Sequence, residues 1–235
     1  GGKYRFALSD QGVIWQIAFA YGGSDNRDPQ KLDRYTFAIN TGPVINFPDL
    51  RLRLSPSLTY VELQKTSKHL LSSYVATVKL DYMFNPDLTL SVKYGHEYRE
   101  FEGRGAPEVD IDGLKFGASY KLTKDDTIGV SYAPKIEDST KDTSDKDQWG
   151  VGLAYNRALP WDMFAAAGVN YKRVELDKAK KAQADDVMDY NLTLGKKLPY
   201  DTFIAATFID MDRDSNVALK SKNNQSFLIT TGWKF

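Results

Sequence analysis

Apolar and polar residues alternate along most of the chain with a period of two, the spacing that places successive side chains on opposite faces of a β-strand. Val78, Leu80 and Tyr82 share one parity, and Lys79 and Asp81 take the other. Further segments repeat this arrangement, so charged residues stand in the middle of strands whose opposite face is apolar. This pattern is typical of antiparallel strands that turn one face to a hydrophobic medium.

Short turns recur between the alternating segments at a spacing of about 38 residues, as expected for a repeated hairpin unit. They are Phe47-Pro48-Asp49, Asn85-Pro86-Asp87, Lys124-Asp125-Asp126, Pro160-Trp161-Asp162 and Pro199-Tyr200-Asp201. Longer polar loops lie between them. The sequence therefore predicts an all-β fold, a transmembrane antiparallel up-and-down β-barrel with tight turns at one end and loops at the other.

The turns predict about twelve strands. They begin near Val13, Arg34, Arg51, Ser72, Leu88, Gly113, Thr127, Gln148, Met163, Val187, Thr202 and Gln225. The six outer loops are expected at residues 22–33, 64–71, 102–112, 137–147, 177–186 and 213–224. Residues 13–235 form the barrel, and residues 1–12 form an N-terminal tail, a plug element or a partial strand. Because Lys3 to Leu8 also alternate and bacterial barrels have even strand counts, fourteen strands are the alternative.

Composition narrows the class of protein further. The chain has 235 residues, of which 42% are hydrophobic, and no run approaches the 18 apolar residues expected of a membrane helix. Cysteine is absent, which suits a periplasm-exposed protein. Thirty-one basic and 31 acidic residues cancel, so the overall charge gives no reason to expect nucleic acid as a partner. The opening Gly1-Gly2-Lys3 lacks the apolar segment of a signal peptide.

Charged residues on the polar parity are expected to line the lumen, with basic residues in excess. The predicted pore-lining residues are Arg34, Arg51, Arg53, Lys79, Asp81, Lys93, Glu97, Arg99, Lys115, Lys121, Lys172, Asp189, Lys197 and Lys234. Asp210 and Asp212 are expected on the same parity. Most other acidic residues fall in the predicted loops, so the lumen is expected to be net positive.

Aromatic residues near the strand ends predict two girdles at the membrane interfaces, where a ring can be half hydrated. The predicted girdle residues are Tyr21, Tyr60, Tyr98, Tyr132 and Tyr171 toward the long loops, and Tyr82, Trp161, Tyr200, Trp233 and Phe235 toward the short turns. The ordinary β-propensity of aromatic residues is the alternative explanation.

Catalysis is not expected, because the chain has only two histidines, His69 and His96. Outer-membrane phospholipases are also twelve-stranded and place a serine two residues from a histidine, but here Tyr98 takes the position of the nucleophile. Asp210 and Asp212 lack the well-placed histidine of an omptin-type protease. The sequence predicts neither a cofactor nor a metal site.

The last strand carries the most specific resemblance. Phe227, Ile229, Thr231 and Trp233 share one parity, and the chain ends on Phe235. This closing strand resembles the C-terminal signal of Gram-negative outer-membrane β-barrel proteins, a porin-like superfamily. The resemblance implies a bacterial outer-membrane location, surrounding lipid, and recognition by the barrel-assembly machinery during biogenesis.

Two functions remain for such a barrel. The first is passive diffusion of small hydrophilic, anionic solutes through a net-positive lumen, because a basic lining lowers the energy of anions in a low-dielectric wall. The second is a secretion or surface-assembly barrel that exports a polypeptide or polysaccharide. It is suggested by the segment from Asp212 to Asn216 and the Trp-x-Phe ending, which loosely resemble barrels that follow periplasmic tetratricopeptide repeats. A structural role, with lumen charges paired across the barrel to close it, is a third alternative.

Overall fold

The computed structural model describes residues 2–7, 12–24, 34–65, 68–103, 106–140, 145–176, 183–199, 202–217 and 221–233. In these residues a single antiparallel sheet is formed by strands in chain order. The strands are β1 (Gly2–Ala7), β2 (Val13–Ser24), β3 (Arg34–Phe47), β4 (Leu52–Lys65), β5 (Lys68–Met83), β6 (Leu88–Phe101), β7 (Glu108–Lys121), β8 (Asp126–Ser139), β9 (Lys146–Ala158), β10 (Met163–Leu176), β11 (Gln183–Leu198), β12 (Thr202–Ser215) and β13 (Lys222–Trp233).

The up-and-down topology confirms the predicted fold class. The twelve strands expected from the sequence are β2–β13, and β1 is a six-residue edge strand paired antiparallel with β2. Several strands begin before their predicted starts, notably β5, β7 and β11, because alternation and pairing continue through polar residues that resemble loop sequence. In the described part of the chain, no helix is long and apolar enough to cross a membrane.

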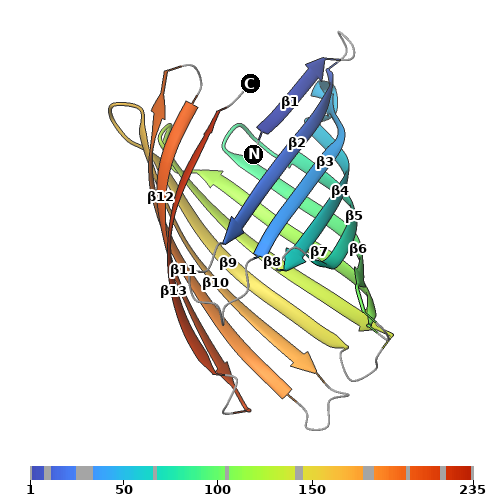
Figure 1. Cartoon of the computed structure of the whole chain (residues 1–235). Coiled ribbons are helices and arrows are strands. Elements are labelled where there is room, and N and C mark those ends of the chain that lie inside the picture. The colour runs from blue at the N-terminus through green and yellow to red at the C-terminus, as the bar shows by residue number, and fades with distance from the viewer. Residues whose placement is uncertain are drawn as a thin grey trace.

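The sheet coils so that one face turns inward (Figure 1). Its edge strands are β1 and β13, and among the described residues no ladder joins them. Since neighbouring strands alternate in direction, β1 and β13 both run toward the end that carries the short turns.

The predicted short turns that the structure describes form, each by its own local chemistry, whereas Tyr200 and Asp201 of the fifth turn lie outside the described residues. The 3₁₀ turn η1 (Pro48–Leu50) ends at Arg51, which has a left-handed φ of 53°. The Asn85 side chain accepts hydrogen bonds from the backbone amides of the two residues that follow Pro86, at 2.9 and 2.7 Å. Trp161 and Asp162 have φ values of 59° and 60°, as a type I′ hairpin turn requires.

The β3–β4 ladder is interrupted where Pro43 faces Pro56, because proline has no amide hydrogen to donate. The strands come close here: a Cβ atom on Gly42 would lie 2.1 Å from the carbonyl oxygen of Pro56. Only glycine fits this approach without moving the backbone.

Candidate functional site

The inner face of the sheet carries three adjoining cavities of about 410, 490 and 450 Å³. They share lining residues, so they form parts of one inner surface, which we call the lumen wall. Six basic residues line these cavities, against three acidic ones. The basic residues are Arg53, Lys79, Lys93, Lys115, Lys135 and Lys172, and the acidic residues are Asp81, Glu97 and Asp189. This part of the wall is net positive.

Asp81 is the buried centre of the basic region, with 4% of its surface exposed. Its Oδ2 atom accepts hydrogen bonds from Arg53 at 2.7 and 3.1 Å, and its Oδ1 atom lies 2.8 Å from Lys79 Nζ. The two basic side chains keep about half of their surface exposed. Asp81 therefore neutralises part of the local positive charge and fixes the position of both cations.

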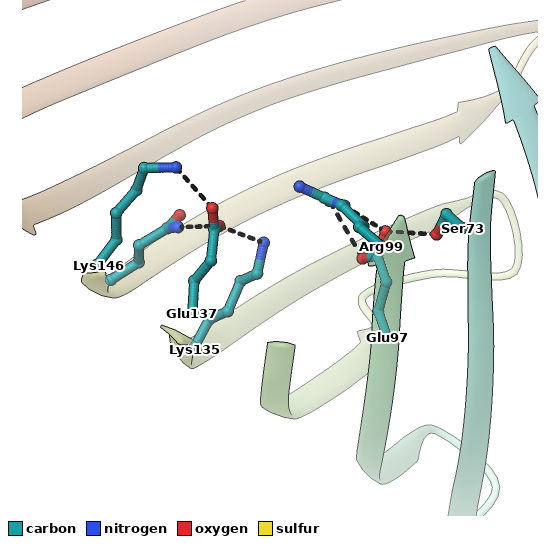
Figure 2. A network of polar contacts seen from close by, with 7 residues as sticks. Ser73, Glu97, Arg99, Lys135, Glu137 and Lys146 are labelled. Atoms are coloured by element: carbon teal, nitrogen blue, oxygen red, sulfur yellow. Dashed lines mark hydrogen bonds and ion pairs between the residues drawn. The ribbon is translucent and has the colours of Figure 1, made fainter. Parts of the chain in front are cut away.

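A second set of polar contacts lies nearer the long loops, on β5 and β6 and on β8 and β9 (Figure 2). Glu97 accepts hydrogen bonds from Ser73 at 2.7 Å and from Arg99 at 2.6 Å. Glu137 is 6% exposed and lies 2.6 Å from Lys146 Nζ. These carboxylates stand close to cations, so they add little uncompensated negative charge to the lumen wall.

The ion pairs of the lumen wall run along the wall. Each pair that the described residues form on this face joins the same strand or neighbouring strands, as in Arg53–Asp81 between β4 and β5, Lys146–Glu137 between β9 and β8, and Arg213–Asp185 between β12 and β11. None of them bridges opposite sides of the barrel. The described pairs therefore do not close the lumen in the way that the structural alternative requires.

Three lysines stand in one row across β5, β6 and β7. Lys79 pairs directly with Lys93, and Lys93 pairs directly with Lys115. Lys79 has Asp81 as an ion-pair partner, whereas Lys93 and Lys115 form no ion pair with another described residue. Directly opposed like charges destabilise a sheet. We call these residues the lysine row.

We expect Lys93→Gln to stabilise the folded protein, because it removes the central charge of the lysine row. The gain should be about 0.2–1 kcal/mol at low ionic strength, and it should shrink as salt screens the repulsion. Urea unfolding of lipid-reconstituted protein measures it. Lys124→Gln, in an exposed turn, is the matched control. A loss of stability that salt does not alter would contradict the proposed repulsion.

The outward face carries an apolar band. Exposed side chains on this parity include Leu58, Val78, Leu80, Val92, Val130, Leu153, Leu192, Leu194 and Phe208. Rings lie outward beyond the band: Tyr60 and Tyr74 have ring centroids 5.3 Å apart toward the long loops. A continuous apolar outer surface around a polar interior is the arrangement of a membrane barrel.

The sequence matches no protein-family model and no curated protein. Solved structures do match. The NanC porin is 12% identical, with a TM-score of 0.58 and coverage of 93% of this chain and 99% of NanC. The β domain of the Bordetella autotransporter BrkA is 11% identical, with a TM-score of 0.50 and coverage of 95% and 99%. OpdK of Pseudomonas aeruginosa, solved with vanillate, is 13% identical, with a TM-score of 0.50 and coverage of 97% and 66%.

The chain has the fold of the outer-membrane β-barrel superfamily. This agrees with the sequence prediction, and no narrower family is identified. The fold and the apolar outer band together support the predicted location in the bacterial outer membrane, with lipid around the barrel.

The structure brings together most of the predicted pore-lining residues that it describes. Arg53, Lys79, Asp81, Lys93 and Lys115 are contiguous on β4–β7. Glu97 with Arg99 lies nearer the long loops, and Lys172 and Asp189 lie on β10 and β11.

The remaining predicted pore-lining residues lie elsewhere. Lys121 and Lys197 share the inward parity but stand at the short-turn end. Arg51 is in the turn after η1, where it donates a hydrogen bond to the carbonyl oxygen of Phe84, so it is a rim residue. The side chain of Arg34 and residue Lys234 lie outside the described residues.

Asp210 and Asp212 are on the outward parity, contrary to expectation. Asp210 pairs with Tyr190, and Asp212 pairs with Met188. Strand β12 has bulky apolar residues on both parities, as Phe208 and Ile209 show, so its sequence alone does not indicate which side chains face inward. The register between β12 and β11 determines the inward face. The same register turns Arg213 inward, to Asp185.

Sequence reasoning missed several inward residues. Glu137 and Lys146 were missed because a loop was expected at 137–147, whereas β8 and β9 continue through these positions. Lys135 was also missed, although it lies in the predicted strand just before that loop. Val109 and Ile111 are buried on the inner face of β7, so the wall is not uniformly polar. The alternation of polar and apolar residues from Lys135 to Glu137 was the signal in the sequence that could have indicated a longer β8.

The predicted girdle residues lie on the outer surface where they are described. Tyr21 is 69% exposed, and Trp161 is 81% exposed in its short turn. Tyr60, Tyr98 and Tyr171 lie toward the long loops, and Tyr82 lies toward the short turns, but Tyr132 is in the middle of β8. Tyr200, Phe235 and the side chain of Trp233 lie outside the described residues.

The two histidines face outward among carboxylates. His96 Nδ1 lies 3.2 Å from Asp112, and His69 Nδ1 lies 3.3 Å from Glu62. His69 Nε2 is 3.1 Å from the Ser72 hydroxyl. The described residues contain no group of three or more metal ligands. The absence of enzyme activity stays a prediction.

Proposed function

We propose that this chain is an outer-membrane channel for passive diffusion of small hydrophilic solutes, with a preference for anions. The observation that carries the proposal is the excess of cations on the lumen wall, six basic residues against three acidic ones around the cavities. Since Lys93 and Lys115 form no ion pair with another described residue and are exposed, their charge is available to a passing solute. A basic lining lowers the energy of an anion inside a low-dielectric barrel.

Two of the similar structures support the same proposal. NanC is described as a porin, and OpdK was solved with vanillate, a carboxylate. We propose a porin-type channel function for this chain as well, with anionic solutes among those that pass. Recognition of its closing strand by the barrel-assembly machinery stays a prediction.

A secretion or surface-assembly function is the second candidate, because the β domain of an autotransporter shares the fold. This candidate needs the barrel to pass a polymer and makes no demand on ion selectivity. Two results together would favour this function over passive diffusion. The purified protein would conduct no current in planar bilayers, and a strain in which the gene is deleted would lack a surface polypeptide or polysaccharide.

We expect purified protein in planar bilayers to conduct with anion preference. In a KCl gradient the reversal potential should lie on the chloride side of zero. Lys93→Glu reverses one charge within the lysine row and should move the reversal potential toward the potassium side, whereas Lys124→Glu, an equal charge change in an exposed turn, should not. Absence of conductance, or cation preference of the unmodified chain, would reject the proposed function.

A further inference from the structure

The lysine row has surroundings that leave its ammonium groups accessible. Lys93 is flanked along the inner face of β6 by Ser91 and Gly95, and Lys115 is flanked along β7 by Gly113 and Gly117. Both lysines are exposed. These neighbours are small and uncharged, so no side chain beside the two lysines on their own strands competes for them.

The nearest charge compensation is on one side of the row only. Asp81 holds Lys79 at 2.8 Å and Arg53 at 2.7 Å, and its carboxylate oxygens are both engaged. Lys93 and Lys115 remain without an ion-pair partner among the described residues. Their pairing in register places their Cβ atoms about 4.5–5.5 Å apart, the usual distance between opposed residues of an antiparallel ladder.

Two adjacent ammonium groups that repel each other are best neutralised by one solute that carries two anionic groups. Once the first anionic group is bound, the second binds at a high effective concentration. A solute with a single charge contacts the same lysines without this gain. The row therefore distinguishes solutes by the number of their charges as well as by sign.

We propose that Lys93 and Lys115 form a binding site for solutes with two or more neighbouring carboxylate or phosphate groups, with Lys79 extending the site toward Asp81. The inference rests on the proposed channel function for its transport consequence, because the site lies on the lumen wall. It assigns the solute class to polyvalent anions.

The test compares solutes of matched chemistry and different valence. Citrate is compared with acetate, and pyrophosphate with orthophosphate, as blockers of single-channel current in about 0.1 M KCl, where the Debye length is about 10 Å. The half-blocking concentration of citrate and of pyrophosphate should be at least about tenfold lower than that of its partner solute. Lys93→Gln and Lys115→Gln should remove most of this difference, and Lys124→Gln should keep it.

Failure of the site and failure of the channel give different results. A chain that conducts anions but is blocked equally by citrate and acetate overturns the site and leaves the proposed function standing. A chain that does not conduct overturns the function. In that case thermal unfolding in detergent decides the site, because citrate should raise the unfolding temperature of the unmodified chain and not that of Lys93→Gln. Equal shifts in both proteins would overturn the site. Circular dichroism confirms that the variants fold.

Discussion

Leu192→Arg should strongly impair folding of the barrel into lipid. Leu192 lies near the middle of β11 on the outward parity, and 58% of its surface is exposed. A charged side chain at the bilayer midplane costs roughly 2–4 kcal/mol on the lipid face of a barrel. The ratio of folded to unfolded protein should fall by about thirty- to a thousandfold, since each 1.4 kcal/mol is a factor of ten. Urea titration in lipid vesicles measures this loss.

Thr193→Arg is the matched control, one residue further along the strand. Thr193 pairs with Ala166 and Thr207 on the inner face, and both neighbours are small. The arginine then enters the polar lumen, so the expected loss is limited to the hydrogen bond between Thr193 and Thr207. Equal destabilisation by the two arginines would contradict the inward and outward assignment of β11.

Asp81→Asn should lower stability and increase anion preference together. The substitution removes the carboxylate that holds Arg53 and Lys79, and it leaves Lys79 as a third uncompensated charge beside Lys93. Loss of hydrogen bonds to a buried charged group costs about 1–3 kcal/mol. Chemical unfolding measures the first effect, and the reversal potential in a salt gradient measures the second, which should move further to the chloride side.

The double variant Asp81→Asn with Lys79→Gln separates the two causes. Removing Lys79 relieves the new repulsion, so part of the lost stability should return and the anion preference should fall toward that of the unmodified chain. If the single variant is as stable as the unmodified chain, Asp81 does not organise this part of the lumen wall.

The sequence predicted the fold and part of the lumen wall wherever bulk and charge separate cleanly by parity. In β5 and β6, Lys79, Asp81 and Lys93 have apolar neighbours on both sides along the chain, so their inward position follows from the period alone. Proline and asparagine at the tight turns likewise identified the hairpin ends through their local conformational preferences.

The other features of the lumen wall depended on information that the two-residue period of the sequence does not contain. Direct pairing of Lys79, Lys93 and Lys115 is set by the registers between β5, β6 and β7, which single-strand patterns do not give. Asp210 was misplaced because both faces of β12 carry large apolar side chains. Glu137 was assigned to a loop because polar residues beyond the apolar band look like loop sequence although they stay paired.

The parallel sense of β1 and β13 restricts how this chain can assemble. Copies inserted with the same orientation are related by rotation about the membrane normal, and such a rotation keeps descending strands descending. The edge strands β1 and β13 of one molecule therefore cannot pair antiparallel with β1 or β13 of a neighbour. A contact between these edges, within one molecule or between such neighbours, would therefore have to be a parallel pair with evenly spaced, slanted hydrogen bonds, unlike the antiparallel ladders that the described strands form.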